Sequence, residues 1–221
     1  MSEQTAEKLR YMVSAYEPEE AAGTLIFTFV PKGLQQERGV GGIPKRVPQF
    51  IVAVRQAAGV LAFDWSGTLD DPGADREEIE AEIAARMRDR ETWIHRVTSL
   101  VDQVEQWARE LGWSTRRVEK KLEDEWIGKH RVPALLMQED TCRFLLEPIG
   151  RSTPGTDGVV DLYLMPAYDD IASLYYYSNR WNLHYMFPGA KPTATVREAE
   201  AMPLSKETLA KVIAELRQHA A

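Results

Sequence analysis

The stretch that most constrains the fold of this chain lies between residues 141 and 188. Aromatic and β-branched residues dominate it, in short runs separated by Gly, Pro, Asn, Asp and Ser. It also contains six of the eight tyrosines of the chain. This pattern is typical of antiparallel strands joined by turns. The sequence therefore predicts an antiparallel sheet in the C-terminal half.

One turn inside this stretch is especially well marked. Ser178, Asn179 and Arg180 separate the run SLYYY from the run WNLHYMF. Asparagine tolerates the positive φ that short hairpin turns require. The sequence therefore predicts a β-hairpin with Asn179 at its tip.

A helical pattern precedes the sheet. Between Gly73 and Leu111, apolar residues recur every three, four or seven positions, and glutamates crowd the first turns, where they favour the helix dipole. The pattern fits either one long helix or two helices with a break near residues 89–92. Gly112 is placed to end it. A further helix is predicted from Ser114, as its N-cap, to Trp126.

These elements predict an α+β fold in which the antiparallel sheet of the C-terminal half packs against a long helical hairpin. Residues 1–72 would form an N-terminal strand and loop region, residues 73–130 the helical hairpin, and residues 131–221 the sheet plus a C-terminal helix capped by Ser205. A chain of 221 residues is long enough for all three regions to share one compact domain.

Charge and composition narrow the classes of function. The net charge of −7 argues against broad, non-specific binding of polyanions. Cys142 is the single cysteine, which excludes an intramolecular disulfide and a cysteine-based zinc site. No apolar run reaches the roughly 18 residues of a membrane span, and the N-terminus lacks the apolar core of a signal peptide. We therefore expect a cytoplasmic protein with no membrane partner.

Residues 108–122, with the sequence ARELGWSTRRVEKKL, resemble the core of a helix-turn-helix. In that motif a small residue lets two helices cross, a glycine forms the turn and a serine caps the second helix. The resemblance implies that the second helix binds nucleic acid through Thr115, Arg116, Arg117, Lys120 and Lys121. Residues 109–131 carry seven lysines and arginines against five acids, which suits such a partner. An ordinary helical corner explains the same pattern.

Residues 60–69, with the sequence VLAFDWSGTL, resemble the first motif of the haloacid dehalogenase family of phosphohydrolases. The resemblance implies that Asp64 is the nucleophile that takes a phosphoryl group, with Mg²⁺ as cofactor, on the first strand of a Rossmann-like fold. Ser66 stands where the family has a second Asp, its usual general acid. A strand that ends in a Ser-Gly turn explains these residues without chemistry.

Polar residues within the predicted sheet form a third candidate site. Alternate residues of a strand share a face, so Asp161 and Tyr163 lie on the same side. If His184 of a neighbouring strand shares that side, the acid and the imidazole would form an acid–base or metal-binding site. A structural hydrogen bond or a solvated face explains both residues equally well. The tyrosine-rich surface also has the composition of a protein-binding interface.

We therefore expect a non-catalytic binding or regulatory module without a cofactor. Its partner would be a protein and, through the helix-turn-helix-like corner, nucleic acid. The alternative is a metal-dependent phosphohydrolase that uses Asp64 and Mg²⁺.

Overall fold

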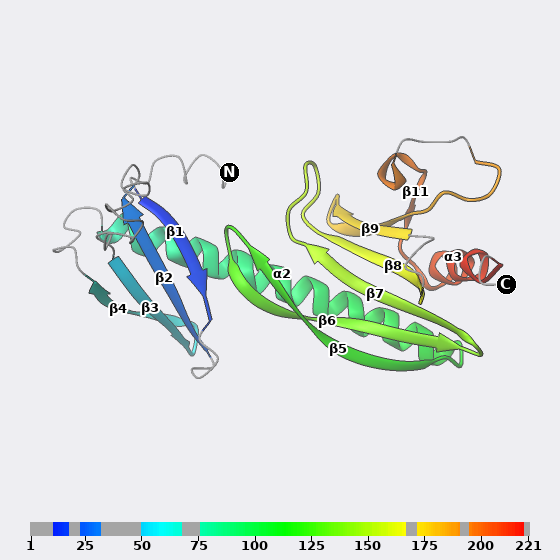
Figure 1. Ribbon diagram of the computed structural model, residues 1–221, viewed down its shortest axis with the longest axis horizontal. Coiled ribbons are helices and arrows are strands. Elements are labelled where there is room, and N and C mark those ends of the chain that lie inside the picture. The colour runs from blue at the N-terminus through cyan, green and yellow to red at the C-terminus, as the bar shows by residue number, and fades with distance from the viewer. Residues whose placement is uncertain are drawn as a thin grey trace, which may run out of the picture. The chain divides into compact units, whose positions relative to one another are not determined.

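The computed structural model of the chain describes six segments, which are residues 11–17, 23–31, 50–67, 76–166, 172–190 and 195–218. The chain divides into two compact units, whose elements are labelled in Figure 1. Unit 1 comprises Met1–Glu91 and Glu123–His130, and unit 2 comprises Thr92–Leu122 and Arg131–Ala221.

Unit 1 contains a four-stranded antiparallel sheet with the strand order β1-β2-β3-β4. Its strands are β1 (Tyr11–Tyr16), β2 (Thr24–Pro31), β3 (Phe50–Ala57) and β4 (Val60–Gly67). Buried and half-buried residues alternate along β2 and β3, as in strands with one face in a core. The apolar core combines this face with the first part of helix α2, and its members are Leu25, Phe27, Phe29, Val52, Val54, Ile79, Ile83 and Met87.

Helix α2 (Arg76–Glu110) is a single helix of 35 residues, so the pattern that fitted one or two helices corresponds to one. It ends as the sequence predicts. Gly112 adopts a φ of +83°, and the backbone N–H of Trp113 donates to the carbonyl of Ala108 at 2.9 Å. This is the left-handed glycine cap that satisfies carbonyls of the last helical turn.

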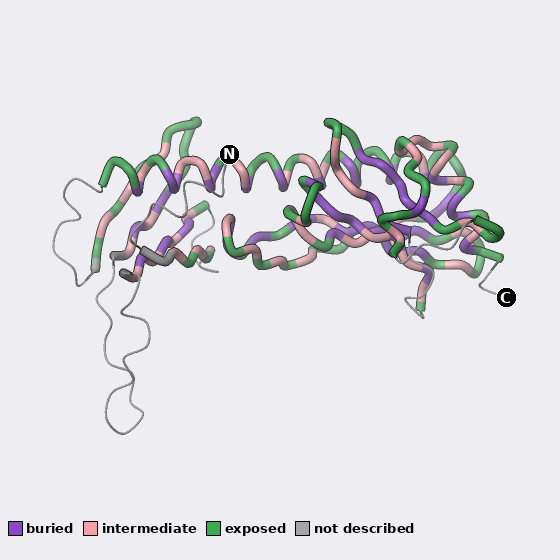
Figure 2. Tube along the Cα trace, turned by 90° about the horizontal axis from the view of Figure 1, so that it is seen from above, coloured by how far each residue is buried: buried purple, intermediate pink, exposed green. Residues whose placement is uncertain are grey.

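Unit 2 contains a seven-stranded antiparallel sheet with the order β11-β10-β9-β8-β7-β6-β5. The strands are β5 (Ser114–Asp124), β6 (Gly128–Glu139), β7 (Cys142–Gly150), β8 (Val159–Met165), β9 (Ala172–Tyr177), β10 (Arg180–His184) and β11 (Ala201–Pro203). The 3₁₀ helix η2 (Val196–Glu198) and helix α3 (Lys206–Gln218) complete it. Along most of β6 and β8 buried residues alternate with exposed or half-buried ones, whereas β7, β9 and β10 contain runs of consecutive buried residues (Figure 2).

One face of this sheet, the helix-covered face, carries the core of unit 2. Val160, Leu162 and Leu164 of β8 are buried on it. Both helices lie on this side. The guanidinium of Arg96 in α2 stacks 3.8 Å from the ring centre of Tyr176. Arg217 of α3 pairs at 2.9 Å with Glu139, which is on the same face of β6 as the buried Met137.

The predicted helical hairpin is wrong. Residues 114–124, predicted to form its second helix, are the edge strand β5 of the seven-stranded sheet, and α2 is the one long helix among the described residues. The sequence RRVEKKLED is rich in helix-forming residues, but pairing with β6 overrides that preference. Charged side chains such as Arg116 and Lys121 are also typical of edge strands, where they oppose pairing with another chain.

The predicted β-hairpin at residues 178–180 and the predicted C-terminal helix are confirmed. Tyr177 pairs with Arg180 across a two-residue turn, and Ser178 and Asn179 adopt φ values of +52° and +58°. Ser205 caps α3, because its hydroxyl accepts the backbone N–H of Thr208 at 3.2 Å. Within the segments that the structure describes, no helix is both long and apolar enough to cross a membrane.

Three buried charged residues, spaced four apart, line one side of α2 in unit 1. The Nε of Arg86 donates to Glu82 at 3.0 Å and its Nη1 to the carbonyl of Trp126 at 3.0 Å, while its guanidinium stacks 4.3 Å from the Trp126 ring centre. Arg90 donates to the carbonyl of Lys129 at 2.6 Å. Burial lowers the pKa of both arginines, against the opposing effect of their carboxylate partners. These contacts fasten residues 123–130 to the helix.

Candidate functional site

The second face of the seven-stranded sheet, the polar face, carries hydroxyl, carboxyl and imidazole groups in place of an apolar core. Ser173 on β9 pairs with Asp161 on β8 and with His184 on β10. Paired residues of antiparallel strands project to the same side. The structure therefore places Asp161 and His184 on one face, with Ser173 between them, while Tyr175 and Tyr177 continue this face along β9.

Asp161 is held by hydrogen bonds within the polar face. The Ser173 hydroxyl donates to its Oδ1 at 2.6 Å, and the Tyr163 hydroxyl donates to its Oδ2 at 3.1 Å. Burial raises the pKa of the Asp161 carboxyl, although both hydrogen bonds act in the opposite direction. The nearby Glu147, which pairs with Lys120 at 2.9 Å, also raises it. Asp161 is thus a satisfied, half-buried carboxyl.

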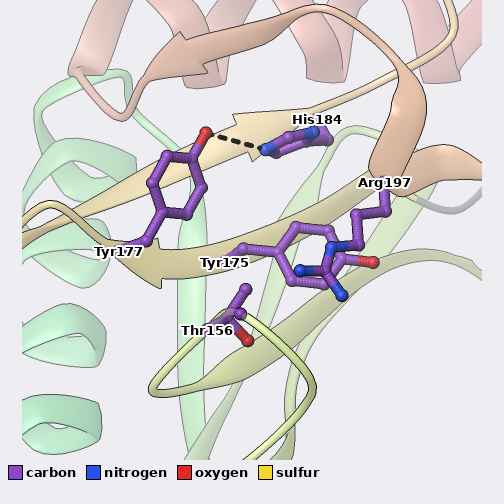
Figure 3. A pocket seen from close by; sticks show the side chains of 6 residues that line it. Thr156, Tyr175, Tyr177, His184 and Arg197 are labelled. Carbon is purple, nitrogen blue, oxygen red and sulfur yellow. Dashed lines mark hydrogen bonds between the residues drawn. The ribbon is translucent and has the colours of Figure 1, made fainter.

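His184 is buried, and its neighbours fix its tautomer. Nδ1 lies 3.2 Å from the carbonyl of Ala199, which can only accept, so Nδ1 carries the proton. Nε2 then accepts the hydroxyl of Tyr177 at 3.2 Å, the contact drawn as a dashed line in Figure 3. Burial lowers the pKa of His184 below its usual value, which favours the neutral imidazole.

A pocket of about 230 Å³ opens beside this pair, and Figure 3 shows its walls. The Tyr175 and His184 rings meet edge to face, with their centres 5.0 Å apart. The Arg197 guanidinium carbon lies 5.8 Å from the centre of the Tyr175 ring. The other lining residues are Gly155, Thr156 and Tyr177.

Gly155 allows Arg197 to approach the pocket. Its φ is +76°, a conformation that favours glycine, and a Cβ at this position would lie 2.7 Å from Nη2 of Arg197. Within the described segments, Arg197 makes no side-chain hydrogen bond or ion pair, and none of the six lining residues is an acid. The pocket therefore combines aromatic walls with one guanidinium that lacks an anionic partner.

The residues predicted to bind nucleic acid lie on the edge strand β5 instead of on a helix. Arg117 donates to Glu105 of α2 at 2.8 Å and pairs with Asp102 at 2.7 Å, and the Thr115 hydroxyl donates to Glu105 at 3.1 Å. Burial alone would raise the pKa of Glu105, but the bonds from Arg117 and Thr115 and the charge of Arg109 lower it. Arg117 and Thr115 thus join β5 to α2.

The other three residues of this group are also on the strand. Lys120 pairs with Glu147 of β7, and Arg116 and Lys121 are exposed. Because the second helix is absent, the groove-binding geometry that the helix-turn-helix resemblance implies is not available to them.

Asp64 lies in β4, which continues through Ser66 and Gly67 instead of ending in a turn there. This strand is at the edge of the four-stranded antiparallel sheet, where Asp64 is exposed and pairs with Ala53 of β3. The Rossmann-like fold that the phosphohydrolase resemblance implies is absent from the described residues. Across those same residues, no group of three or more His, Cys, Asp or Glu side chains is arranged to hold a metal ion.

Sequence reasoning missed the loop residues of the pocket. Arg197 follows a proline-rich connector, and Gly155 lies in the turn-forming run STPGTDG, so neither belongs to a periodic segment. The available signal was Gly155 itself, which indicates a tight turn but not what approaches it.

No protein family model, no curated protein and no solved structure matches this chain. The site is therefore interpreted from its own geometry.

Proposed function

We propose that this chain is a binding module that docks a protein partner on the polar face of unit 2, with a carboxylate of the partner held in the pocket at Arg197. The observation that carries this proposal is the Arg197 guanidinium, which makes no ion pair with any described residue, in a pocket whose six lining residues include no acid. A carboxylate supplies the two acceptor oxygens that match the fork of a guanidinium.

The surroundings of Arg197 favour an anion. Burial lowers the pKa of His184, which favours its neutral form, and the remaining walls are tyrosine, threonine and glycine, so Arg197 is the permanent charge of the pocket. Arg197 is exposed, which leaves its guanidinium accessible to a partner. Aromatic walls contribute contact area at a low cost in side-chain entropy, and tyrosine is common at the centres of protein interfaces.

The size of the pocket favours a single side chain as its occupant. At about 230 Å³ it lies below the roughly 300–1,000 Å³ of typical ligand and cofactor sites. A glutamate or aspartate side chain of a partner, or its C-terminal carboxylate, is a group of suitable size.

The hydrogen bonds on the polar face support binding over catalysis. A serine nucleophile needs a base that accepts its proton, and that base needs an orienting acid. Here the Ser173 hydroxyl donates directly to Asp161, and the Nε2 of His184 accepts from Tyr177. The serine and the histidine are each engaged with another partner.

An NMR titration tests this proposal with N-acetyl-glutamate N′-methylamide, a blocked acidic residue, and with its glutamine counterpart as the neutral control. We expect the glutamate compound to shift the amide resonances of Gly155, Tyr175 and Arg197 saturably, and the glutamine compound to leave them unchanged. Arg197→Gln should weaken binding by about tenfold or more, because it removes the charge-assisted pair.

Arg143→Gln is the matched control, since Arg143 is an exposed arginine on a strand of the same unit and does not line the pocket. Equal shifts with both compounds, or wild-type binding by Arg197→Gln, would show that the pocket does not select a carboxylate.

A further inference from the structure

A larger groove lies on the helix-covered side of the β9–β10 hairpin, within unit 2. Its volume is about 570 Å³, and it runs between α2, the hairpin and the segment just after β11. Tyr176 and Trp181 point to this side, whereas Tyr175 and Tyr177 point to the pocket of the polar face. The groove is therefore separate from the site of the proposed function.

The floor of the groove is apolar. Leu100 of α2 and Trp181 of β10 are buried beneath it, and Leu204 is half-buried at its end. The Trp181 and Tyr176 rings pack edge to face, with centres 5.3 Å apart. An aliphatic or aromatic side chain placed against the half-buried Tyr176 and Leu204 would bury further apolar area.

The charges around the groove have one sign. Arg96 and Arg180 are among its twelve lining residues, and none of the twelve is an acid, although the chain as a whole carries −7. Arg96 is held in place, because it stacks on Tyr176 and donates to the carbonyl of Asp157 at 2.5 Å. Arg180 pairs with Tyr177, so its side chain leaves the end of β10 toward the polar face, but the residue also lines the groove. It is exposed and makes no side-chain hydrogen bond or ion pair with any described residue.

We infer that this groove binds an acidic peptide segment with an apolar anchor residue. The anchor would lie against Tyr176 and Leu204, above Trp181, and a neighbouring Asp or Glu would pair with Arg180. The charge complementarity sets the sign of the ligand, and the apolar floor favours a peptide over a nucleic acid backbone. This inference does not depend on the proposed function, because the two sites share no lining residue.

Panning a phage-displayed random peptide library against the full chain tests the inference. We expect the selected peptides to be enriched in Asp or Glu beside Leu, Phe or Trp. A synthetic copy of the best peptide should lose about tenfold or more in affinity when its acids become Gln or Asn, and a similar factor against Arg180→Glu, because each change removes the charge pair.

Two matched variants give the controls. Arg116→Glu makes the same charge change at an exposed position of β5, and Arg197→Gln removes the cation of the other site. Both should bind the peptide as the wild type does. Peptides without acidic enrichment, or equal affinity for Arg180→Glu and wild type, would overturn the inference. So would a labelled oligonucleotide that binds in place of the peptide and is lost in Arg180→Glu.

Discussion

Two arginines of unit 1 and two of unit 2 have opposite surroundings. In unit 1, Arg86 and Arg90 are buried on α2, and their donors are taken up by carboxylates and by backbone carbonyls. In unit 2, Arg180 and Arg197 are exposed beside hollows and make no ion pair within the described residues. All four residues are arginines, so the residue type does not distinguish them. They differ in how many of their guanidinium N–H groups have an acceptor within the described residues.

The difference has an energetic basis. Removing one partner of a buried ion pair leaves the other charge without compensation in a poorly solvated place. An exposed arginine keeps its hydration, so its removal changes stability little. Truncation of a buried, ion-paired arginine should therefore lower the free energy of unfolding much more than truncation of an exposed arginine in a binding site.

The largest expected effect is that of Arg86→Ala. It leaves Glu82, which is 3% exposed, without its partner and removes the bond to the Trp126 carbonyl. We expect unit 1 to lose roughly 3–5 kcal/mol of unfolding free energy, the usual cost of breaking a buried pair. Urea unfolding followed by Trp126 fluorescence measures this loss.

Arg197→Ala is the matched control for that measurement. It should change the unfolding free energy by no more than roughly 0.5 kcal/mol. Comparable losses in the two variants would remove the distinction between the arginines of unit 1 and those of unit 2.

A smaller effect is expected from Gly128→Ala, compared with Gly112→Ala. Both glycines have positive φ, so both substitutions carry the cost of roughly 1–2 kcal/mol for a left-handed residue. A Cβ at Gly128 would also lie 2.5 Å from the carbonyl oxygen of Ala15, whereas nothing lies within 4 Å of one at Gly112. Overpacking should add roughly 1–3 kcal/mol at Gly128, measured by thermal or urea unfolding.

Equal losses at the two glycines would show that the backbone of unit 1 gives way easily at this contact. Residues 123–130 would then be held on α2 less tightly than the hydrogen bonds from Arg86 and Arg90 indicate.

The smallest effect is expected from Asp161→Asn on the polar face of unit 2. Burial raises the pKa of Asp161 above its usual 3.8, so the folded state binds the proton more tightly than the unfolded state. The protonated Asp161 carboxyl therefore makes its full contribution to stability below pH 3.8. This contribution is lost as the pH rises through the raised pKa of the folded state. At pH 7, Asp161→Asn should therefore be more stable than wild type.

Unfolding measured across the pH range checks the sign of this effect. The advantage of Asp161→Asn should shrink toward zero as the pH falls below 3.8, and the exposed control Glu200→Gln should show no comparable gain. A destabilised Asp161→Asn at pH 7 would mean that the bonds from Ser173 and Tyr163 outweigh the cost of burial.

Periodicity and turn chemistry predicted much of the fold. The apolar repeat before Gly112, the Ser205 cap and the turn at Asn179 each depend on neighbouring residues, so the sequence alone indicates them. Strand β5 was missed because Val118 and Leu122 have helical spacing and because nothing local shows that β6 will pair with it.

The candidate site likewise contains residues that the sequence indicates and one residue, Arg197, that it does not. Side-chain parity places Asp161 and Tyr163 together, and strand pairing adds His184. Arg197 lies outside any periodic segment, and its guanidinium lies close to Gly155, more than 40 residues earlier in the chain, where a Cβ would be 2.7 Å from its Nη2.

The three consecutive tyrosines of β9 have a consequence for how the two hollows evolve. Tyr175 and Tyr177 serve one hollow and Tyr176 serves the other, so the hairpin is a wall common to both. A strand shifted by one residue turns every side chain to the opposite face. The register of β9 against β8, in which Asp161 pairs with Ser173 and Val159 with Tyr175, thus decides which tyrosines face each hollow.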